Sequence, residues 1–263
     1  MLNLIVPTMP SRAGNWPTLR RNFEECRDRA GGQVNWIVVI YTDEWAKVSA
    51  ADKRILEADG AVLLVITPPS DGFMPCLYKL NAGLDWLAAG GAVGTGSNPV
   101  PISGSRVERD PTRQWCYFGA DDDLVPRSLG VRVADVARRE PDAQVIVCSC
   151  QRGQRAVMTG YPTWPLIAEP GNMVPCAVTG SQAIVRLDAF AALPPGQDVA
   201  HPEAPRERLR FRSHAIADGE MIQWLHRRVA NRFHYLRDYY LPFNALEAQR
   251  WDADALERVL AAE

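Results

Sequence analysis

The sequence predicts an α/β protein with a mostly parallel, Rossmann-like central sheet flanked by helices, and a smaller region of mixed β structure. Short apolar runs alternate with amphipathic segments through the first half of the chain, which is the pattern of strand–helix–strand units. The runs at 36–41 and 61–66 are continuous and rich in β-branched residues, as in strands buried on both faces. Hydrophobic residues make up 47% of the 263 residues, which is enough for a substantial buried core.

The expected elements follow one another in a regular order. Strands are expected at 2–6, 36–41, 61–66 and 114–119. Apolar residues at helical spacing predict helices at 16–29, after a possible cap at Asn15, and at 79–89. In the second half, helices are expected at 127–139 and 218–229, with a short helix from 252. Strands are expected at 144–150 and 232–240, with mixed β segments between them up to 187. Two segments rich in Gly, Ser, Pro or charge predict long surface loops at 90–113 and 194–212.

Composition and charge exclude several classes of protein. The formal net charge is -2, so the chain lacks the basic excess of a nucleic-acid-binding surface. Cys148 and Cys150 alternate on an expected strand, but no second pair completes a zinc site, so the cysteines are expected to be buried thiols in a reducing compartment. The first residues lack a charged signal region, and no stretch approaches the ~18 apolar residues of a spanning helix. We therefore expect a soluble, cytoplasmic protein without a transmembrane segment.

Three carboxylates stand in a row, Asp121, Asp122 and Asp123, directly after the expected strand at 114–119. Ligands of open parallel sheets bind outside the carboxyl ends of the strands. Hard cations such as Mg²⁺ prefer oxygen ligands and keep positions open for substrate phosphates. Because alternate residues of an extended turn face the same way, we expect Asp121 and Asp123 to hold a divalent cation and Asp122 to point away. The alternative is a solvated acidic turn before the helix that begins near Arg127.

Five short motifs occur in an order that is typical of one enzyme family. They are Leu4-Ile5-Val6-Pro7-Thr8, Lys79-Leu80-Asn81-Ala82-Gly83-Leu84, Tyr117 to Pro126, Thr179 to Arg186, and Ala217-Asp218-Gly219-Glu220-Met221. In these motifs the chain resembles the family-two glycosyltransferases, which share the GT-A fold and carry a DxD metal motif at a strand end. Two positions depart from the family pattern. The second strand ends in Tyr41-Thr42-Asp43-Glu44 instead of an aspartate-aspartate-glycine-serine turn, and a glycine separates the two acids of the last motif.

The resemblance implies a single GT-A domain over 1–263, in which 1–126 bind the nucleotide sugar and 127–263 receive the acceptor. It implies metal-dependent, inverting transfer of a sugar from a nucleoside diphosphate donor to a hydroxyl of a sugar, glycan or other acceptor. Mn²⁺ or Mg²⁺ at Asp121 and Asp123 would neutralise the departing diphosphate, as Lewis-acid catalysis requires. Two alternatives stay open: a nucleotidyltransferase of related fold, and a non-catalytic protein that binds sugar nucleotides.

Residues at the expected strand ends are candidates for the donor site. The resemblance implies that Pro7 and Thr8 lie beneath the base and that Asp121 and Asp122 contact the nucleotide sugar. Asp43 follows the second strand, where a carboxylate can accept a hydrogen bond from an imide N–H. Uracil, thymine and guanine have that donor and cytosine lacks it, so UDP or dTDP donors are favoured. As an alternative, Asp43 would cap the following helix.

Four further residues have a structural interpretation beside the functional one. Arg12, in the loop after the first strand, either reaches phosphate or belongs to a flexible turn. Lys79 either adds positive charge for the diphosphate, assisted by the amide groups of a helix that starts there, or is a surface lysine. Asn81 is either a ligand or a helix cap. His234 either completes the metal shell or is a core residue.

The general base is expected from the last acidic motif, in which Asp218 and Glu220 are two residues apart. Residues i and i+2 do not share a face of a helix, so only one of them can point at the acceptor. Asp218 is favoured because it lies where the helix should begin, and Glu220 is the alternative. A structural explanation needs no catalysis, since Asp218 can be a cap and Glu220 an acid in the first helical turn.

Overall fold

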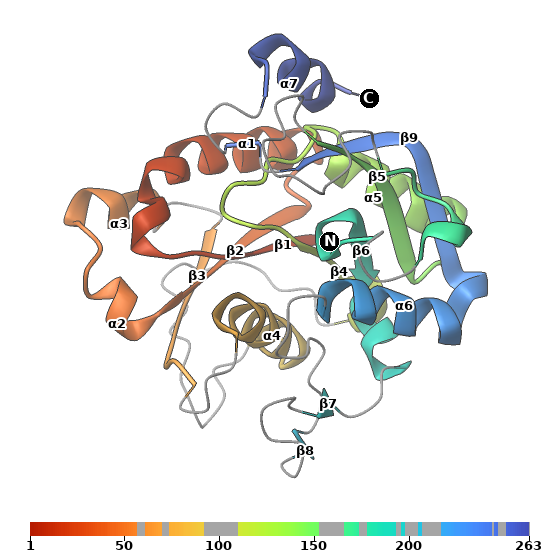
Figure 1. Ribbon diagram of the computed structural model, residues 1–263, viewed down its shortest axis with the longest axis horizontal. Coiled ribbons are helices and arrows are strands. Elements are labelled where there is room, and N and C mark those ends of the chain that lie inside the picture. Colours follow the sequence, from red (N-terminus) through yellow and green to blue (C-terminus); the bar gives the residue numbers. More distant parts are fainter. Residues whose placement is uncertain are drawn as a thin grey trace, which may run out of the picture.

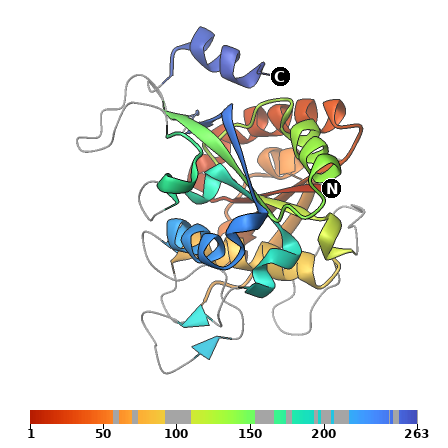
Figure 2. The ribbon, with the colours of Figure 1, turned by 90° about the vertical axis from the view of Figure 1, so that its right-hand side faces the viewer.

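The computed structural model describes residues 1–56, 61–69, 74–91, 110–152, 166–173, 178–192, 196–197, 205–206, 217–243, 245–246 and 251–262. These residues form a central sheet with helices packed on both of its faces (Figure 1, Figure 2). The α/β class that the sequence predicts is therefore confirmed.

A seven-stranded sheet forms the centre of the molecule. Its strands lie in the order β3 (Ala61–Ile66), β2 (Val34–Tyr41), β1 (Leu2–Pro7), β4 (Trp115–Phe118), β6 (Ala183–Arg186), β5 (Val145–Arg152) and β9 (Phe233–Phe243). β6 is antiparallel to both of its neighbours, and the other adjacent pairs in this sheet are parallel. A second, two-stranded sheet pairs β7 (Gly196–Gln197) with β8 (Pro205–Arg206).

Helices cover both faces of the seven-stranded sheet. One face carries α1 (Trp16–Arg29), α3 (Ala50–Leu56), α5 (Leu129–Arg139) and α7 (Ala253–Leu260). The other face carries α4 (Pro75–Ala88) and α6 (Ala217–Val229). The short helix α2 (Thr42–Trp45) follows β2 directly. In Figure 1, α1 and α7 lie above the sheet and α4 and α6 lie below it.

Alternate strand residues divide the buried apolar side chains into two cores. Leu4 and Val6 of β1 pack with α1 and α5, whereas Ile5 between them packs with α4. In β2, Val38 and Val39 divide in the same way. Because both faces are covered, these strands carry apolar residues at consecutive positions, which is why the sequence shows continuous apolar runs there.

The strand order changes direction at the carboxyl end of β1. The chain passes from β1 through α1 to β2 on one side, whereas β4 pairs with β1 on the other side. α1 and α4 therefore diverge on opposite faces at this point. Ligands of open α/β sheets bind outside the strand ends at such a change of direction, so we expect the functional site in this region, the crevice outside the carboxyl ends of β1 and β4.

Several boundaries differ from those expected. α4 begins at Pro75 and not at Lys79, because a proline fits the first turn of a helix, where its missing N–H costs nothing. α5 begins at Leu129, and the last strand extends to Phe243. Most of the two expected loops, at 92–109 and over the greater part of 194–212, lies outside the described residues. No helix in the described part of the chain is long and apolar enough to cross a membrane.

Candidate functional site

The acidic triplet follows β4 and lies at this crevice. Asp121 is 8% exposed, Asp122 7% and Asp123 6%. A charge that is withdrawn from water needs compensation by partners of opposite charge or by hydrogen bonds. This degree of burial argues against the alternative of a solvated acidic turn, and it raises the question of which groups compensate the three carboxylates.

Arg12 is the cation that faces two of the three carboxylates. It lies in the 3-10 helix η1 (Pro10–Asn15), directly after β1. Its Nε is 3.8 Å from Asp121 Oδ1, and its Nη1 is 3.5 Å from Asp122 Oδ2. Charge-assisted hydrogen bonds are shorter, about 2.7–2.9 Å. A single guanidinium, 41% exposed, therefore lies loosely over two buried carboxylates.

The arrangement inside the triplet differs from the expected one. Asp122 does not point away, since it shares Arg12 with Asp121. Asp123 turns back instead, and its Oδ2 accepts from the Ala120 N–H at 3.4 Å. The reason is a tight turn, closed by a hydrogen bond from the Asp123 N–H to Ala120 O, so the segment is not extended. The role of Asp123 as a metal ligand stays a prediction.

Side chains of α1 hold the segment that carries the triplet. Asn22 donates to Val125 O and accepts from the Val125 N–H, both at 2.8 Å. Asn15 is the N-cap residue of α1, as expected, but its side chain makes no cap hydrogen bond, and its Nδ2 donates instead to Asp121 O at 2.9 Å. The irregular segment after β4 is therefore fixed by side-chain amides rather than by a regular element.

The side chain of Asp121 is held by Thr8, the residue after β1. Thr8 Oγ1 donates to Asp121 Oδ2 at 2.9 Å and accepts from Trp16 Nε1 at 2.8 Å. Burial raises the pKa of Asp121, and the charge of Asp122 adds to this. The Thr8 hydrogen bond and Arg12 lower the same pKa. For Asp121, the effect of burial is thus larger than that of the Thr8 hydrogen bond and of Arg12.

Lys79 is a buried cation between three elements. It lies in the second turn of α4 and is 1% exposed. Its Nζ donates to Thr8 O at 2.6 Å, pairs with Glu44 Oε2 at 2.6 Å and lies 4.3 Å from the centre of the Tyr41 ring. Lys79 is thus neither a surface lysine nor a residue at a helix start, and both of those expectations are wrong. Because Glu44 balances its charge, a role toward the diphosphate stays a prediction.

Glu44 is a site residue that sequence reasoning missed. Its Oε2 also accepts the N–H of Tyr41, the N-cap of α2, at 3.1 Å. A glutamate three residues after a cap position is a known helix-start signal and could have identified it. Asp43 is not the cap of this helix, and its side chain is exposed beside the end of β2. Its role in reading the base stays a prediction.

Two further candidates lie on β1 and α4. Pro7 ends β1 and is half-buried, and the next residue, Thr8, continues the ladder with an N–H bond to Val39 O at 3.0 Å. Asn81 is 6% exposed within α4, well past the first turn. The expectation that Asn81 caps a helix is therefore wrong, whereas its role as a ligand stays a prediction.

Asp218 is the second residue of α6, and its side chain links this helix to the residue Gly180. Its Oδ2 accepts from the Gly180 N–H and its Oδ1 from the Gly219 N–H, both at 2.8 Å. Gly180 begins the 3-10 helix η4 (Gly180–Gln182), and a Cβ added there would lie 3.1 Å from the Cβ of Asp218. Glu220 is partly exposed in the same turn. Asp218 is thus a fixed carboxylate inside α6 and not its N-cap.

The first turn of α4 connects the two charged groups. Partial burial raises the pKa of the Cys76 thiol, the negative charge of Asp218 raises it further, and the positive charge of Lys79 lowers it. Both charges therefore act on the same short stretch of α4.

Comparison with known proteins identifies the fold. No family model matches the sequence, and no curated protein matches it. TarS 1–349 of S. aureus is 14% identical over 91% of this chain and 59% of that chain, with a TM-score of 0.52. The mannosyltransferase PcManGT from Pyrobaculum calidifontis, in complex with GDP-Man and Mn²⁺, is 13% identical over 95% of this chain and 58% of that chain, with a TM-score of 0.54.

The chain has a GT-A-type glycosyltransferase fold. It spans less than two thirds of the length of either of these two chains. The fold that the sequence motifs predicted is thereby confirmed, at a level of identity that shows the architecture alone.

His234 lies away from the triplet in this GT-A fold. It is the second residue of β9, three strands from β4, which corresponds to roughly 14 Å across a sheet. Its Nδ1 lies 2.9 Å from Glu140 Oε1. The structure does not bring His234 to Asp121, because His234 lies near the start of β9, whereas Asp121 follows the carboxyl end of β4, and the two strands run in the same direction. Among the described residues, no three His, Cys, Asp or Glu side chains form a group that could hold a metal ion.

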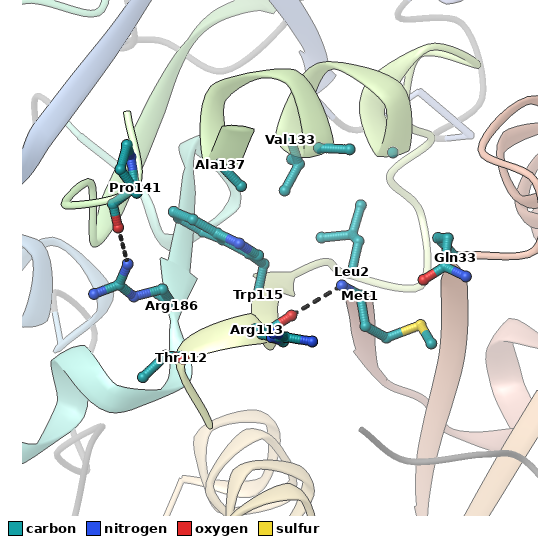
Figure 3. Close-up of a pocket in the computed structure, with 12 residues that line it drawn as sticks. Met1, Leu2, Gln33, Thr112, Arg113, Trp115, Val133, Ala137, Pro141 and Arg186 are labelled. Atoms are coloured by element: carbon teal, nitrogen blue, oxygen red, sulfur yellow. Dashed lines mark hydrogen bonds between the residues drawn. The ribbon is translucent and has the colours of Figure 1, made fainter. Parts of the chain in front are cut away.

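A cavity of about 550 Å³ lies at the other end of the same strands (Figure 3). It is lined by Leu2 and Trp115, the first residues of β1 and β4, and by Val133 of α5. Arg186 also lines it and donates to Pro141 O at 2.7 Å. No residue that the sequence predicts for the site is among its lining residues, so this cavity is separate from the crevice.

Proposed function

We propose that the protein is a glycosyltransferase that moves a sugar from a nucleoside diphosphate donor to an acceptor hydroxyl, with Mn²⁺ or Mg²⁺ as cofactor. The observation that carries the proposal is the pair of buried carboxylates, Asp121 and Asp122, under the loosely placed Arg12 in the crevice of a GT-A fold. The similar mannosyltransferase was solved with GDP-Man and Mn²⁺, which supports this class of donor and metal.

The charges in the crevice fit a divalent cation. Asp121 and Asp122 are both buried, their contacts with Arg12 are longer than charge-assisted hydrogen bonds, and burial raises the pKa of Asp121, so added positive charge would stabilise the ionised carboxylates. Mg²⁺ is commonly held by one or two carboxylates together with substrate phosphates, so three protein ligands are not needed. Asp121 and Asp122 would hold the ion, with Asp123 as the further candidate. When bound, it would supply positive charge against the departing diphosphate.

Arg12 is placed to bind the diphosphate itself. Its contacts with Asp121 and Asp122 are long, and 41% of its side chain is exposed. A cation at the carboxylates would repel the guanidinium, whose planar donor groups match phosphate oxygens. Arg12 would then move from the carboxylates to the phosphates, and Lys79 would stay fixed below them through Glu44 and Thr8 O.

The donor base would lie beside the end of β2. Asp43 is exposed there and would accept the imide N–H of uracil, thymine or guanine, whereas cytosine has no such donor. Pro7 and Thr8 would form the floor beneath the base. Donors with uridine or thymidine are therefore proposed, and a guanosine donor obeys the same hydrogen-bond rule.

The acceptor would bind in the half of the domain that follows residue 126, with 1–126 holding the donor. Asp218 would take the proton of the attacking hydroxyl in an inverting transfer, and Glu220 is the alternative base. The two amide hydrogen bonds fix the orientation of Asp218 and leave lone pairs for the acceptor. The same bonds also favour a second candidate function, a non-catalytic sugar-nucleotide binder, in which Asp218 only joins η4 to α6.

A donor-consumption assay tests this proposal. The protein is incubated with Mn²⁺ and a panel of nucleoside diphosphate sugars, with and without simple sugar acceptors, and the released nucleoside diphosphate is measured. We expect release with one or more donors, its loss in Asp121→Asn, and a loss of about 10²- to 10⁴-fold in kcat with donor binding retained in Asp218→Asn or Glu220→Gln. Donor binding without release would support the binder, and pyrophosphate release from a nucleoside triphosphate would support a nucleotidyltransferase.

A further inference from the structure

The first residue of α1 reaches the acidic triplet through a threonine. Trp16 Nε1 donates to Thr8 Oγ1 at 2.8 Å, and Thr8 Oγ1 donates to Asp121 Oδ2 at 2.9 Å. Trp16 is 1% exposed and Thr8 is 2% exposed, so water does not compete for these groups. Two consecutive hydrogen bonds therefore join α1 to one oxygen of the candidate metal ligand.

The direction of these hydrogen bonds is set by the indole. An indole N–H can only donate, so Thr8 Oγ1 has to accept from Trp16. The single hydroxyl proton of Thr8 is then left for Asp121, whose carboxylate accepts it. Without the indole N–H, the buried Thr8 oxygen would lose its donor, and its hydroxyl would be less restricted in orientation.

This arrangement leaves the other oxygen of Asp121 for the crevice. Oδ2 is held on the Thr8 side, whereas Oδ1 lies 3.8 Å from Arg12 Nε. The main chain of Asp121 is held in addition, because Asn15 Nδ2 donates to Asp121 O at 2.9 Å. Asn15 and Trp16 are consecutive, so the N-terminal end of α1 fixes both the backbone and the side chain of Asp121.

We propose that Trp16 is a positioning residue of the donor site, which acts through Thr8 to present Asp121 Oδ1 to a divalent cation. The inference rests on the proposed function, because it requires that the cation binds at Asp121. Hydrogen-bond partners that orient a ligating carboxylate typically change metal affinity by about 10- to 100-fold. Because Trp16 is buried, it would act on the cation through the orientation of Asp121 and not by contact with donor or acceptor.

Trp86 offers a matched comparison that separates packing from hydrogen bonding. It is 4% exposed in α4, and its Nε1 is buried without a hydrogen-bond partner among the described residues. Trp86→Phe and Trp16→Phe remove the same atoms from a buried site. Trp16→Phe also breaks a hydrogen bond, because the Trp16 N–H that it removes donates to Thr8 Oγ1.

The test measures Mn²⁺ binding directly, from the electron paramagnetic resonance signal of the free ion, without nucleotide. We expect Trp16→Phe to weaken binding about tenfold, and Trp86→Phe to leave it within about twofold. Thr8→Val should weaken binding at least as much as Trp16→Phe, and Thr8→Ser should retain it. The double variant of Trp16→Phe with Thr8→Val should bind no more weakly than Thr8→Val, because both changes break the same chain of hydrogen bonds.

The outcomes separate this inference from the proposed function. A wild-type protein that does not bind Mn²⁺ overturns the proposed metal site and this role of Trp16 with it. A wild type that binds Mn²⁺, together with a folded Trp16→Phe variant of equal affinity, overturns the positioning role alone. Additive effects in the double variant overturn the path through Thr8. If Trp16→Phe does not fold, replacement of Trp16 by 3-benzothienylalanine, which keeps both rings and lacks the N–H, gives the same comparison.

Discussion

Single residues of the triplet differ in what they face. Asp121 and Asp122 share Arg12 across the crevice, whereas Asp123 accepts the Ala120 N–H. After burial, which is the larger cause, the charge of Asp123 also raises the pKa of Tyr117, a β4 side chain in the core beneath α1. Asp123 therefore acts on the core side of the segment, and the two carboxylates under Arg12 are the better placed for a cation.

The division of the triplet predicts unequal effects of isosteric substitutions. Asp121→Asn and Asp122→Asn should each weaken Mn²⁺ binding by about 10- to 100-fold, since each removes a charged ligand worth roughly 1.5–3 kcal/mol. Asp123→Asn should have a smaller effect. Calorimetric titration with Mn²⁺ checks this, and a larger loss in Asp123→Asn than in Asp122→Asn would restore the pairing expected from the sequence.

Removal of Arg12 should weaken diphosphate binding without weakening cation binding. In Arg12→Gln the carboxylates lose a competing cation, so the affinity for Mn²⁺ alone should stay equal or rise a few-fold. Affinity for a nucleoside diphosphate in the presence of Mn²⁺ should fall about tenfold, because a charge-assisted hydrogen bond is lost. Both are measured by calorimetry on the same variant. If the variant bound the nucleoside diphosphate as tightly as the wild type, Arg12 would only neutralise the carboxylates when no cation is bound.

The pair of Lys79 and Glu44 joins four elements below the crevice. Lys79 comes from α4 and Glu44 from α2, and their contacts include Thr8 O at the end of β1 and the N–H of Tyr41 at the end of β2. Lys79 is buried, whereas 20% of the Glu44 side chain is exposed. The pair therefore fixes the spacing of the strand ends on which the donor would lie.

Breaking this pair from its two sides should have unequal consequences. Glu44→Gln leaves Lys79 charged and buried without a carboxylate, and should cost about 3 kcal/mol of unfolding free energy. Lys79→Met leaves Glu44, which reaches water and keeps its bond to the Tyr41 N–H, and should cost less. Urea unfolding of both variants and of the double variant measures the difference. A loss below about 1 kcal/mol in Glu44→Gln would contradict the pairing.

The close packing of α4 on β1 gives another prediction. A Cβ at Gly83 would lie 2.6 Å from Ile5 Cγ2, a methyl group on a stiff, β-branched side chain in the core. Alanine would gain up to about 1 kcal/mol of helix propensity, but overpacking costs about 1–3 kcal/mol. Gly83→Ala should therefore lower the unfolding free energy.

Gly171→Ala is the control for this substitution, because nothing lies within 4 Å of a Cβ at that position. Urea unfolding compares both variants with the wild type. An unchanged or raised stability of Gly83→Ala would mean that α4 can move away from β1, and the fixed position of Lys79 would then lose its support.

Over the whole molecule, the sequence was most informative where a single local pattern decided the structure. The continuous apolar runs predicted β2 and β3 because both faces of these strands are covered, and the strand order then located the crevice. The motif order predicted the GT-A-type fold. These features depend on burial and on the spacing of apolar residues, and both can be read from a short stretch of sequence.

The rest depended on contacts between distant segments, which no local pattern contains. The turn at Ala120 places Asp122, and not Asp123, beside Arg12 with Asp121. Lys79 became a buried partner of Glu44 only because α2 and α4 meet at the end of β1. His234 was a candidate metal ligand because it comes late in the chain, but its strand lies at the edge of the sheet, and its side chain lies beside Glu140.

The central claim is that the crevice above β1 and β4 binds a nucleoside diphosphate through a divalent ion. Calorimetric titration of UDP and GDP into the wild-type protein, with Mn²⁺ and then with EDTA, tests it most directly, with Asp121→Asn as the matched variant. The account predicts binding with Mn²⁺ that is at least about tenfold weaker in EDTA and in Asp121→Asn. Equal affinity in all three conditions would contradict it.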